Sequence, residues 1–211
     1  MFALALKACA MAILALIPAA VHAQDIDLHV VTRSFYQANI PQRLGIIFRP
    51  KVLFEVSFPE LFVEPGLLPL TLTAGIRLPR NATMDAPMFR IIGDNGEGPF
   101  IILMVDVDAP IHPTPATGEF RHFLGANFFL NDVMDPFLLS NSTPALSEYQ
   151  EPHPILSEPH RYAFLIFSQP DNFNDSVGGS PFYTTTSYFN LTDFILQTGL
   201  DQPCGGTYMI L

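Results

Sequence analysis

Short apolar runs, separated by turn-forming residues, dominate the chain beyond its first two dozen positions. The runs are rich in Val, Ile, Phe and Leu, and many of the 20 prolines and 13 glycines bound them. This spacing is typical of strands, so we predict an all-β dominated fold. The run Phe100–Val107 is the most apolar and is expected to be a central strand buried on both faces. The strands are predicted over Lys51–Phe58, Leu68–Ala74, Phe89–Gly93, Phe100–Val107, His122–Leu130, Tyr162–Ser168 and Tyr208–Leu211.

Helices are expected in two places only, Leu138–Gln150 and Leu191–Leu200. In the second, Asn190 can cap the beginning and Gly199 the end. The long, polar and Pro-rich stretch Asn131–Pro159 is predicted to form a loop that borders a functional site. No repeat, low-complexity segment or linker interrupts the chain. We therefore expect one domain over residues 24–211.

The first 23 residues have the pattern of a removable signal peptide. Lys7 precedes an apolar run that only Pro18 breaks, and Val21-His22-Ala23 supplies small residues where a signal peptidase cleaves. An uncleaved membrane anchor is the alternative, but spanning a bilayer takes roughly 20 continuous apolar residues. No later segment is long and apolar enough to span. The pattern predicts a protein that is secreted or resides in the lumen of the secretory pathway.

Composition and charge narrow the range of binding partners and covalent features that the chain can have. The net charge of −10 argues against nucleic acid and anionic membranes as main partners. Cys9 belongs to the predicted signal peptide, so Cys204 is left alone and no internal disulfide is expected. A lone buried cysteine is usually inert, which disfavours Cys204 as a nucleophile. Four sequons mark candidate glycosylation sites at Asn81, Asn141, Asn174 and Asn190.

The familiar catalytic signatures are absent. The sequence has no Gly-x-Ser-x-Gly elbow, no His-Glu-x-x-His and no phosphate- or dinucleotide-binding Gly-rich loop. No cofactor is therefore expected. Polar residues instead gather at the ends of three apolar runs, in Asp106–Pro110, Gly118–His122 and Glu158–Tyr162. Carboxylates and imidazoles at the mouths of buried strands are costly unless they pair or bind something.

Strand geometry suggests which of these side chains share a face. Alternate residues of a strand point the same way. Asp106 and Asp108 are therefore predicted to point in one direction, and His160 and Tyr162 likewise. Two Asp and two His could also hold a metal ion, but no His-x-His or Cys-x-x-Cys spacing supports that reading and none is expected.

Three blocks taken together resemble the phosphatidylethanolamine-binding protein family, also called the Raf-kinase-inhibitor-protein family. They are Asp-x-Asp-Ala-Pro at Asp106–Pro110, Glu-x-x-His-Phe at Glu119–Phe123 and Pro-His-Arg-Tyr at Pro159–Tyr162. Weaker similarity extends over Lys51–Phe58, Glu64–Gly66 and Leu200–Tyr208. The resemblance implies a β-sandwich with a few short peripheral helices and a small anion pocket.

The resemblance also implies the residues of the pocket. Asp106, His122 and His160 would line it, Tyr162 would lie beside them, and Pro110 would shape the turn, with a cis bond as a candidate at Ala109–Pro110. His122 and His160 are the candidates for proton transfer if the protein is catalytic. The full predicted ligand-binding set is Asp106, Asp108, Pro110, Glu119, His122, His160 and Tyr162.

Several of these residues have a structural alternative. Arg161 is expected to form an ion pair rather than to contact the ligand. Asp108 and Glu119 have two open roles: they can hold Arg161 or turn amides, or they can line the pocket. His153 occupies the approach to the third block and can change the pocket rim. Phe120 can form a wall. Arg121 stands where many relatives have a second histidine.

The signal peptide, the sequons and the acidic composition look most like secreted fungal members of the family. Three functions remain open. The chain can be a non-catalytic binder of a small anionic ligand or lipid headgroup. It can be an accessory or catalytic protein in the assembly of polyketide-derived dimeric anhydrides (maleidrides), working beside biosynthetic partner enzymes. It can also be a secreted peptidase inhibitor that acts through a surface loop.

Overall fold

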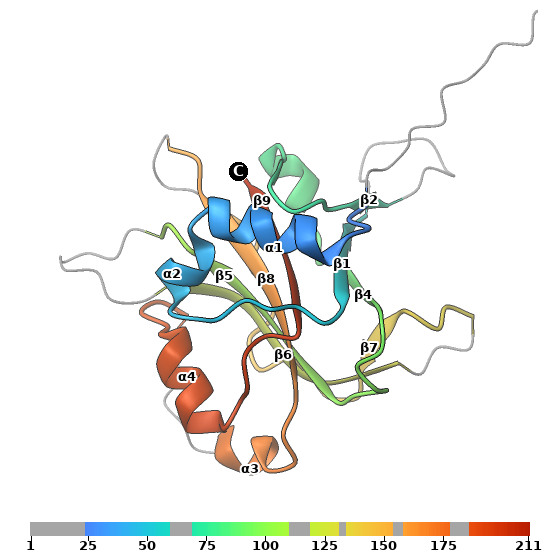
Figure 1. Ribbon diagram of the computed structural model, residues 1–211. Coiled ribbons are helices and arrows are strands. Elements are labelled where there is room, and N and C mark those ends of the chain that lie inside the picture. Colours follow the sequence, from blue (N-terminus) through green and yellow to red (C-terminus); the bar gives the residue numbers. More distant parts are fainter. Residues whose placement is uncertain (1–23, 60–68, 110–118, 131–133, 154–157, 178–185) are drawn as a thin grey trace, which may run out of the picture.

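The computed structural model describes residues 24–59, 69–109, 119–130, 134–153, 158–177 and 186–211 (Figure 1). The predicted signal peptide lies outside these ranges. The elements are α1 (Leu28–Gln37), α2 (Ile40–Leu44), β1 (Leu53–Phe58), β2 (Leu70–Thr71), β3 (Ile76–Arg77), the 3₁₀ helix η1 (Arg80–Thr83), β4 (Met88–Ile92), β5 (Phe100–Asp106), β6 (Phe120–Leu130), β7 (Leu139–Asn141), β8 (Arg161–Ser168), α3 (Phe173–Val177), α4 (Leu191–Thr198) and β9 (Gly205–Ile210).

The strands form two sheets. The smaller has the order β2-β1-β4, and the larger has the order β3-β9-β8-β5-β6-β7. All neighbouring strands are antiparallel except β3 and β9, which are parallel. The fold is thus mostly β with a few short helices, as the apolar runs predict.

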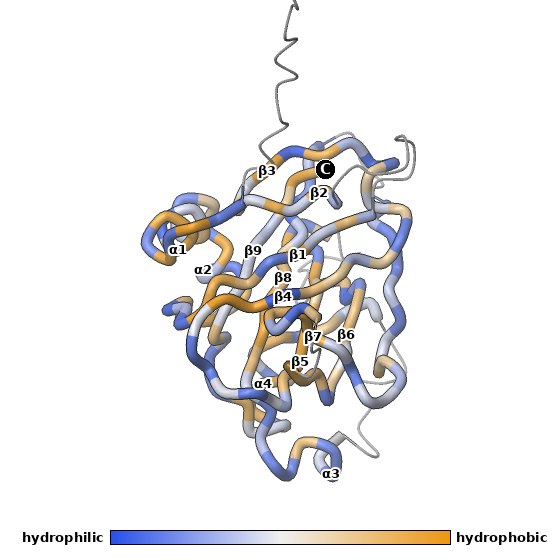
Figure 2. The backbone as a smooth tube through the Cα atoms, turned by 90° about the vertical axis from the view of Figure 1, so that its right-hand side faces the viewer, coloured by the Kyte–Doolittle hydropathy of each residue, from blue (hydrophilic) through white to orange (hydrophobic). Residues whose placement is uncertain are grey.

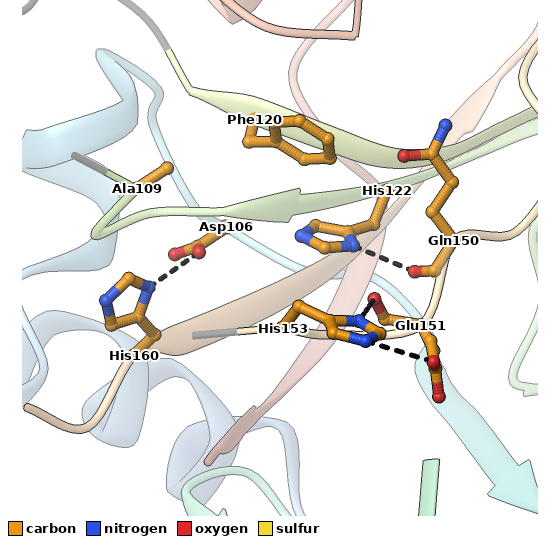
Figure 3. Close-up of a pocket in the computed structure, with 8 residues that line it drawn as sticks. All are labelled: Asp106, Ala109, Phe120, His122, Gln150, Glu151, His153 and His160. Atoms are coloured by element: carbon orange, nitrogen blue, oxygen red, sulfur yellow. Dashed lines mark hydrogen bonds and ion pairs between the residues drawn. The ribbon is translucent and has the colours of Figure 1, made fainter. Parts of the chain in front are cut away.

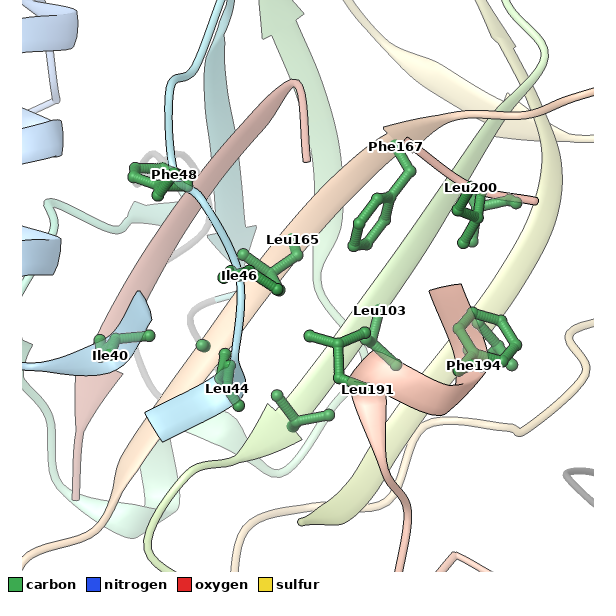
Figure 4. Close-up of a cluster of buried hydrophobic side chains, with 14 of the residues drawn as sticks. Ile40, Leu44, Ile46, Phe48, Leu103, Leu165, Phe167, Leu191, Phe194 and Leu200 are labelled. Atoms are coloured by element: carbon green, nitrogen blue, oxygen red, sulfur yellow. The ribbon is translucent and has the colours of Figure 1, made fainter. Parts of the chain in front are cut away.

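Strand β5 lies at the centre of the larger sheet, and all seven of its residues are buried. Its even-numbered residues, such as Ile102, pack with the apolar face of the small sheet. Its odd-numbered residues, such as Leu103, pack with α1, α2 and α4. Figure 4 shows the second packing, in which Leu191 and Phe194 of α4 lie over β5 and β8. The prediction of a central strand buried on both faces is confirmed, and apolar residues concentrate along these inner strands (Figure 2).

The helix predicted over Leu191–Leu200 is confirmed as α4. The side chain of Asn190 accepts a hydrogen bond from the backbone N–H of Asp193, and Gly199 ends the helix with a φ of 70°. Helix α1 is not among the predicted elements. It begins at Asp27, whose carboxylate accepts from the N–H of His29, and it buries Val31 and Phe35 against the larger sheet.

The helix predicted over Leu138–Gln150 is wrong. Its first residues form β7 at the edge of the larger sheet, where Leu139 pairs with Leu130 of β6. The rest of the segment runs along β6 without regular structure, held by backbone bonds between Ser147 and Leu124. Pairing with β6 satisfies these backbone groups, so tertiary context overrides the local helical pattern.

Candidate functional site

A cavity of about 460 Å³ opens at the end of the larger sheet where β5 ends and β6 and β8 begin. It contains both histidines of the three predicted blocks, and Figure 3 shows His122 beside Gln150 and His160 beside Asp106. Its lining consists of Asp106, Ala109, Phe120, His122, Gln150, Glu151, His153 and His160.

The centre of the site is a buried pair between Asp106 and His160. Asp106 is the last residue of β5, and His160 directly precedes β8, the antiparallel neighbour of β5. Nδ1 of His160 lies 2.7 Å from Oδ2 of Asp106, and both residues are 4% exposed. A carboxylate at Nδ1 fixes the orientation of the imidazole and leaves Nε2 for a ligand.

His122 is held by a different kind of acceptor. Its Nδ1 lies 2.8 Å from the backbone carbonyl oxygen of Gln150, and the N–H of Gln150 donates to the carbonyl of His122 at 2.9 Å. Because a carbonyl only accepts, Nδ1 of His122 carries a proton. The neutral ring therefore presents Nε2 as an acceptor.

A β-bulge positions His122 on β6. Met104 pairs with Phe123 and Val105 pairs with Arg121, so His122 is the extra residue between these pairs. Bulges of this kind are common beside functional sites because they redirect a side chain. Because of the bulge, His122 lines the cavity while the next residue, Phe123, stays packed in the core.

Electrostatics keep His122 neutral. Burial lowers the pKa of His122 below its ordinary value of 6.5, and the hydrogen bond to Gln150 and the charge of Asp106 offset this only in part. The ligand-free site therefore holds an uncharged imidazole at neutral pH.

Tyr162 lies behind the two imidazoles rather than on the cavity surface. Its ring centroid is 5.2 Å from that of His122 and 6.3 Å from that of His160. The residue is completely buried, and its hydroxyl makes no hydrogen bond of ordinary geometry with another described residue. Burial, followed by the charge of Asp106, raises the pKa of Tyr162. The phenol therefore stays protonated, and its ring packs against the two imidazoles without lining the cavity.

The prediction that Asp108 points the same way as Asp106 is wrong. Strand β5 ends at Asp106, whose Oδ1 accepts a hydrogen bond from the N–H of Asp108 at 2.9 Å. The chain turns there, and strand alternation no longer applies. Asp108 instead accepts from Nε of Arg161 at 2.7 Å and from its backbone N–H at 2.9 Å. Arg161 also donates to the carbonyl of Ala38 after α1, so the expected structural ion pair is confirmed.

Glu119 likewise does not line this cavity. It pairs through its backbone with Phe189, and its Oε2 accepts from the N–H of Leu191 at the beginning of α4. Burial raises the pKa of Glu119 to about 7. Its neighbour Arg121 is buried, donates to Oγ of Ser147 and lies over the ring of Phe189 at 5.1 Å. Both side chains hold the segment before α4 rather than a ligand.

The rim contains residues that the sequence motifs do not include. Glu151 and His153 line the cavity, with Nε2 of His153 3.2 Å from Oε1 of Glu151. Arg80 of η1 lies 3.8 Å from the same oxygen. Phe120 and His153, which are expected from the sequence at the wall and the rim, do line the cavity. Gln150 and Glu151 line it as well, although they are not among the predicted site residues. Gln150 acts through its backbone carbonyl, which has no sequence signature.

Two further expectations concern Pro110 and metals. Pro110 and the Ala109–Pro110 bond lie outside the described residues, and Gly98–Pro99 is a cis bond elsewhere in the chain. Within the part of the chain that the structure describes, no three His, Cys, Asp or Glu residues gather closely enough to hold a metal ion. In the same part, no helix is long and apolar enough to cross a membrane.

Two packed sheets, with a cavity beside the buried Asp106–His160 pair at the end of the larger one, define a mostly β class of protein. The family model described as phosphatidylethanolamine-binding protein matches residues 63–208, and the chain belongs to this family. The Arabidopsis thaliana protein named BROTHER of FT and TFL 1 is 25% identical over 162 residues, which cover 77% of this chain and 81% of the plant protein.

Solved structures support the fold. A carboxypeptidase Y inhibitor, solved in complex with its cognate proteinase, superposes with a TM-score of 0.66 at 20% identity, covering 87% of this chain and 95% of the inhibitor chain. A phosphatidylethanolamine-binding protein from Plasmodium vivax gives a TM-score of 0.63 at 16% identity, with coverages of 85% and 95%. At these identities the likeness extends to the fold alone.

Proposed function

We propose that the chain binds a small anionic ligand between His122 and His160, and that binding is accompanied by proton uptake. One observation carries the proposal. Both imidazoles have Nδ1 engaged by an acceptor, the Asp106 carboxylate in one case and the Gln150 carbonyl in the other, which leaves Nε2 of both for the same cavity. A neutral Nε2 only accepts, so an anion needs a protonated ring or must bring its own proton.

The charges of the lining favour a ligand of low charge. The cavity surface includes the carboxylates of Asp106 and Glu151 but no lysine or arginine. A phosphoryl dianion would meet two like charges, and the fixed cation at the rim, Arg80, lies outside the lining and is already paired with Glu151. Like charges in a low-dielectric site repel strongly. A carboxylic acid, a monocarboxylate or a cyclic anhydride fits better than a phosphoryl headgroup. The ring of Phe120 and the methyl group of Ala109 offer an apolar surface to the rest of such a ligand.

The same arrangement supports a catalytic version of this function. An imidazole oriented by a buried carboxylate is suited to general acid–base chemistry, so His160 is placed to move a proton to or from a bound acid or anhydride. On this basis we propose a role in the coupling of anhydride units in fungal secondary metabolism, beside biosynthetic partner enzymes. The signal-peptide pattern of residues 1–23 supports action in the secretory pathway, and the exposure of Asn81, Asn141 and Asn174 is compatible with glycosylation there.

Native mass spectrometry of the protein purified from its host tests the binding proposal directly. A co-purifying acid or anhydride that is absent from the double variant His122→Asn/His160→Asn supports the proposal. An empty cavity in the wild-type protein, together with no heat of binding for acetate or maleate at pH 6, overturns it. Incubation with a maleic-anhydride-type monomer then separates the catalytic version from simple binding, because only catalysis gives a coupled product that depends on His160.

Inhibition of a peptidase is the alternative from a different class. The carboxypeptidase Y inhibitor shares the fold, and no residue of the cavity described above argues for that activity. Inhibition of a secreted carboxypeptidase that survives in the His122→Asn/His160→Asn variant would favour the alternative. Anion binding that is lost in this variant, with no inhibition by the wild-type protein, would favour the binder.

A further inference from the structure

A second cavity, of about 470 Å³, lies where the edge of the small sheet meets the edge of the large one. Strands β4 and β7 are neighbours there, joined by a bridge between Arg90 and Leu138 (Figure 1). The rings of Phe89, Phe123 and Phe128 contribute to its lining, with centroids 5.6 to 6.4 Å apart. We call this cavity the phenylalanine groove.

The phenylalanine groove is distinct from the candidate anion site, and no residue lines both. The two share a wall that is one residue thick. On β6, His122 lines the anion site and Phe123 lines the groove. In the segment after β7, Gln150 lines the anion site and Tyr149 lines the groove. The groove therefore has its own chemistry, and it extends along β6 to Phe128, away from the strand ends that form the anion site.

The lining of the groove is mostly apolar, and its polar members are Ser140, Asn141, Glu148 and the hydroxyl of Tyr149. Met88, Leu139 and the ring of Tyr149 join the three phenyl rings, and the Tyr149 hydroxyl is engaged, donating to the carbonyl of Thr83 at 2.6 Å. The lining contains no lysine, arginine or histidine. Glu148 is its only charged residue, and it is exposed, with no ion pair to any described residue.

The electrostatic surroundings of the groove are also negative. Asp85 directly precedes Ala86 of the lining, and Glu151, which is paired with Arg80, follows Tyr149 by two residues. Burial raises the pKa of Tyr149, and the charges of Glu151 and Asp85 raise it further. Arg90, the nearby cation of β4, is paired with Asp135 at 2.7 Å. An anion would therefore be repelled from the groove, whereas a cation would be attracted.

We propose that the phenylalanine groove is a second ligand site, which binds a small organic cation with an apolar chain, such as an alkylammonium. The chain lies on the phenyl rings, and the ammonium group lies beside Glu148. The cavity volume is within the range of about 300–1,000 Å³ that is usual for small-molecule sites. Aromatic rings also attract cations, which adds to the charge complementarity.

The test compares three six-carbon probes that differ only in their head group: hexyltrimethylammonium, hexanol and hexanesulfonate. Methionines labelled with ¹³C at the methyl group report the position of binding by NMR. Met88 lines the groove and is 37% exposed, whereas Met209 is completely buried in β9 and serves as the internal reference. Hexyltrimethylammonium is expected to shift the Met88 signal in a saturable way and to bind more tightly than hexanol, with hexanesulfonate the weakest.

Glu148→Gln is the decisive variant, because the side chain is exposed and its replacement does not threaten the fold. It is expected to weaken hexyltrimethylammonium about threefold, as befits one exposed charge pair, and to leave hexanol unchanged. Asp201→Asn is the matched control, since this exposed acid follows α4 and does not line the groove, and it should leave the Met88 titration within error of the wild type.

Three outcomes overturn the proposal. Equal affinities for the cationic and anionic probes would show an indifferent apolar surface. A Met88 signal that does not respond to any probe would show a groove closed to ligands. Self-association in sedimentation experiments that shifts Met88 and blocks the probe would identify a second copy of the chain as the occupant. Because Met88 reports only on the groove, failure here does not depend on the outcome for the anion site.

Discussion

Asp106 and His160 form a buried hydrogen-bonded pair in which Oδ2 and Nδ1 are 2.7 Å apart and both residues are 4% exposed. The two come from strands that are neighbours in the sheet but lie more than 50 positions apart in the sequence. Removing one member of such a pair leaves a buried polar atom of the other without its hydrogen bond, which costs more than the bond contributes. The free energy of unfolding should therefore fall by different amounts when Asp106 and when His160 is replaced.

His160→Ala is expected to destabilise the protein by about 3 kcal/mol, because it leaves Oδ2 of the buried Asp106 carboxylate without a hydrogen-bond donor. Asp106→Asn should cost less, about 1–2 kcal/mol, since the amide oxygen can still accept from Nδ1 but the amide nitrogen cannot accept from the Asp108 N–H. The double variant should lose less than the sum of the two losses. Urea unfolding at pH 7 measures these free energies.

Asp135→Asn is the control for this comparison. Asp135 pairs with Arg90 at the same distance of 2.7 Å, but its side chain is 29% exposed. An exposed pair should cost no more than about 1 kcal/mol. Equal losses for His160→Ala and Asp106→Asn, with additive effects in the double variant, would contradict a coupled buried pair.

Anion binding should weaken as the pH rises. Burial lowers the pKa of His122, so the ligand-free ring is neutral at pH 7, and a bound anion raises that pKa by favouring the imidazolium. Affinity then rises as the pH falls through the pKa of the bound state and levels off below the pKa of the free state. If one proton is taken up, the dissociation constant for acetate should change by up to about tenfold per pH unit between these limits.

Calorimetry of acetate binding between pH 6 and 8, in two buffers of different ionisation enthalpy, measures both the affinity and the number of protons taken up. His122→Gln should remove most of the pH dependence. His29→Gln, which changes an exposed histidine of α1 outside the cavity lining, should leave it unchanged. A dissociation constant that is flat from pH 6 to 8 would rule out proton-coupled binding.

The sequence was informative wherever a residue's role depends on its own strand. The apolar runs located seven strands of the fold, and Asn190 and Gly199 predicted both ends of α4. The three polar blocks also identified Asp106, His122 and His160, because strand ends that are adjacent in an antiparallel sheet bring such residues together.

The failures have a common physical cause, which is contact with a distant segment. Asp108 leaves the cavity because it pairs with Arg161, which lies 53 positions away in the sequence. Glu119 turns toward Leu191, more than 70 residues away. Gln150 orients His122 through a backbone carbonyl that any residue type would supply. No local pattern contains these partners, so only the folded chain identifies them.

Gly125→Ala should destabilise the core beside the phenylalanine groove. A Cβ at this position would lie 2.6 Å from the Phe128 ring and 2.8 Å from the Phe123 ring, so both rings would have to move. Overpacking of this kind usually costs about 1–3 kcal/mol. Thermal and urea unfolding give the loss, and Met88 NMR should show displaced phenyl rings in the groove. Gly96→Ala is the control for a lost glycine, because a Cβ there meets nothing within 4 Å, although its positive φ of 78° carries a backbone cost of its own.

Glu119 should make stability fall as the pH rises toward 8. Its pKa is raised from 4.5 to about 7 by burial, so between these values the folded state keeps a proton that the unfolded state has lost. The stabilising contribution is complete below pH 4.5 and disappears as the pH rises through 7. Glu119→Gln, which stays neutral and still accepts from the Leu191 N–H, should therefore be more stable than the wild type at pH 8, by about 1–2 kcal/mol after allowance for partial exposure.

The measurement is the difference in unfolding free energy between Glu119→Gln and the wild type at several pH values from 5 to 8. Taking the difference cancels contributions from His122, whose lowered pKa acts in the opposite direction. Glu158→Gln, at an exposed position before β8, is the control and should show no pH-dependent difference. A variant less stable than the wild type at pH 8 would mean that the Glu119 carboxylate is ionised and favourable beside α4, with Arg43 as its counter-charge.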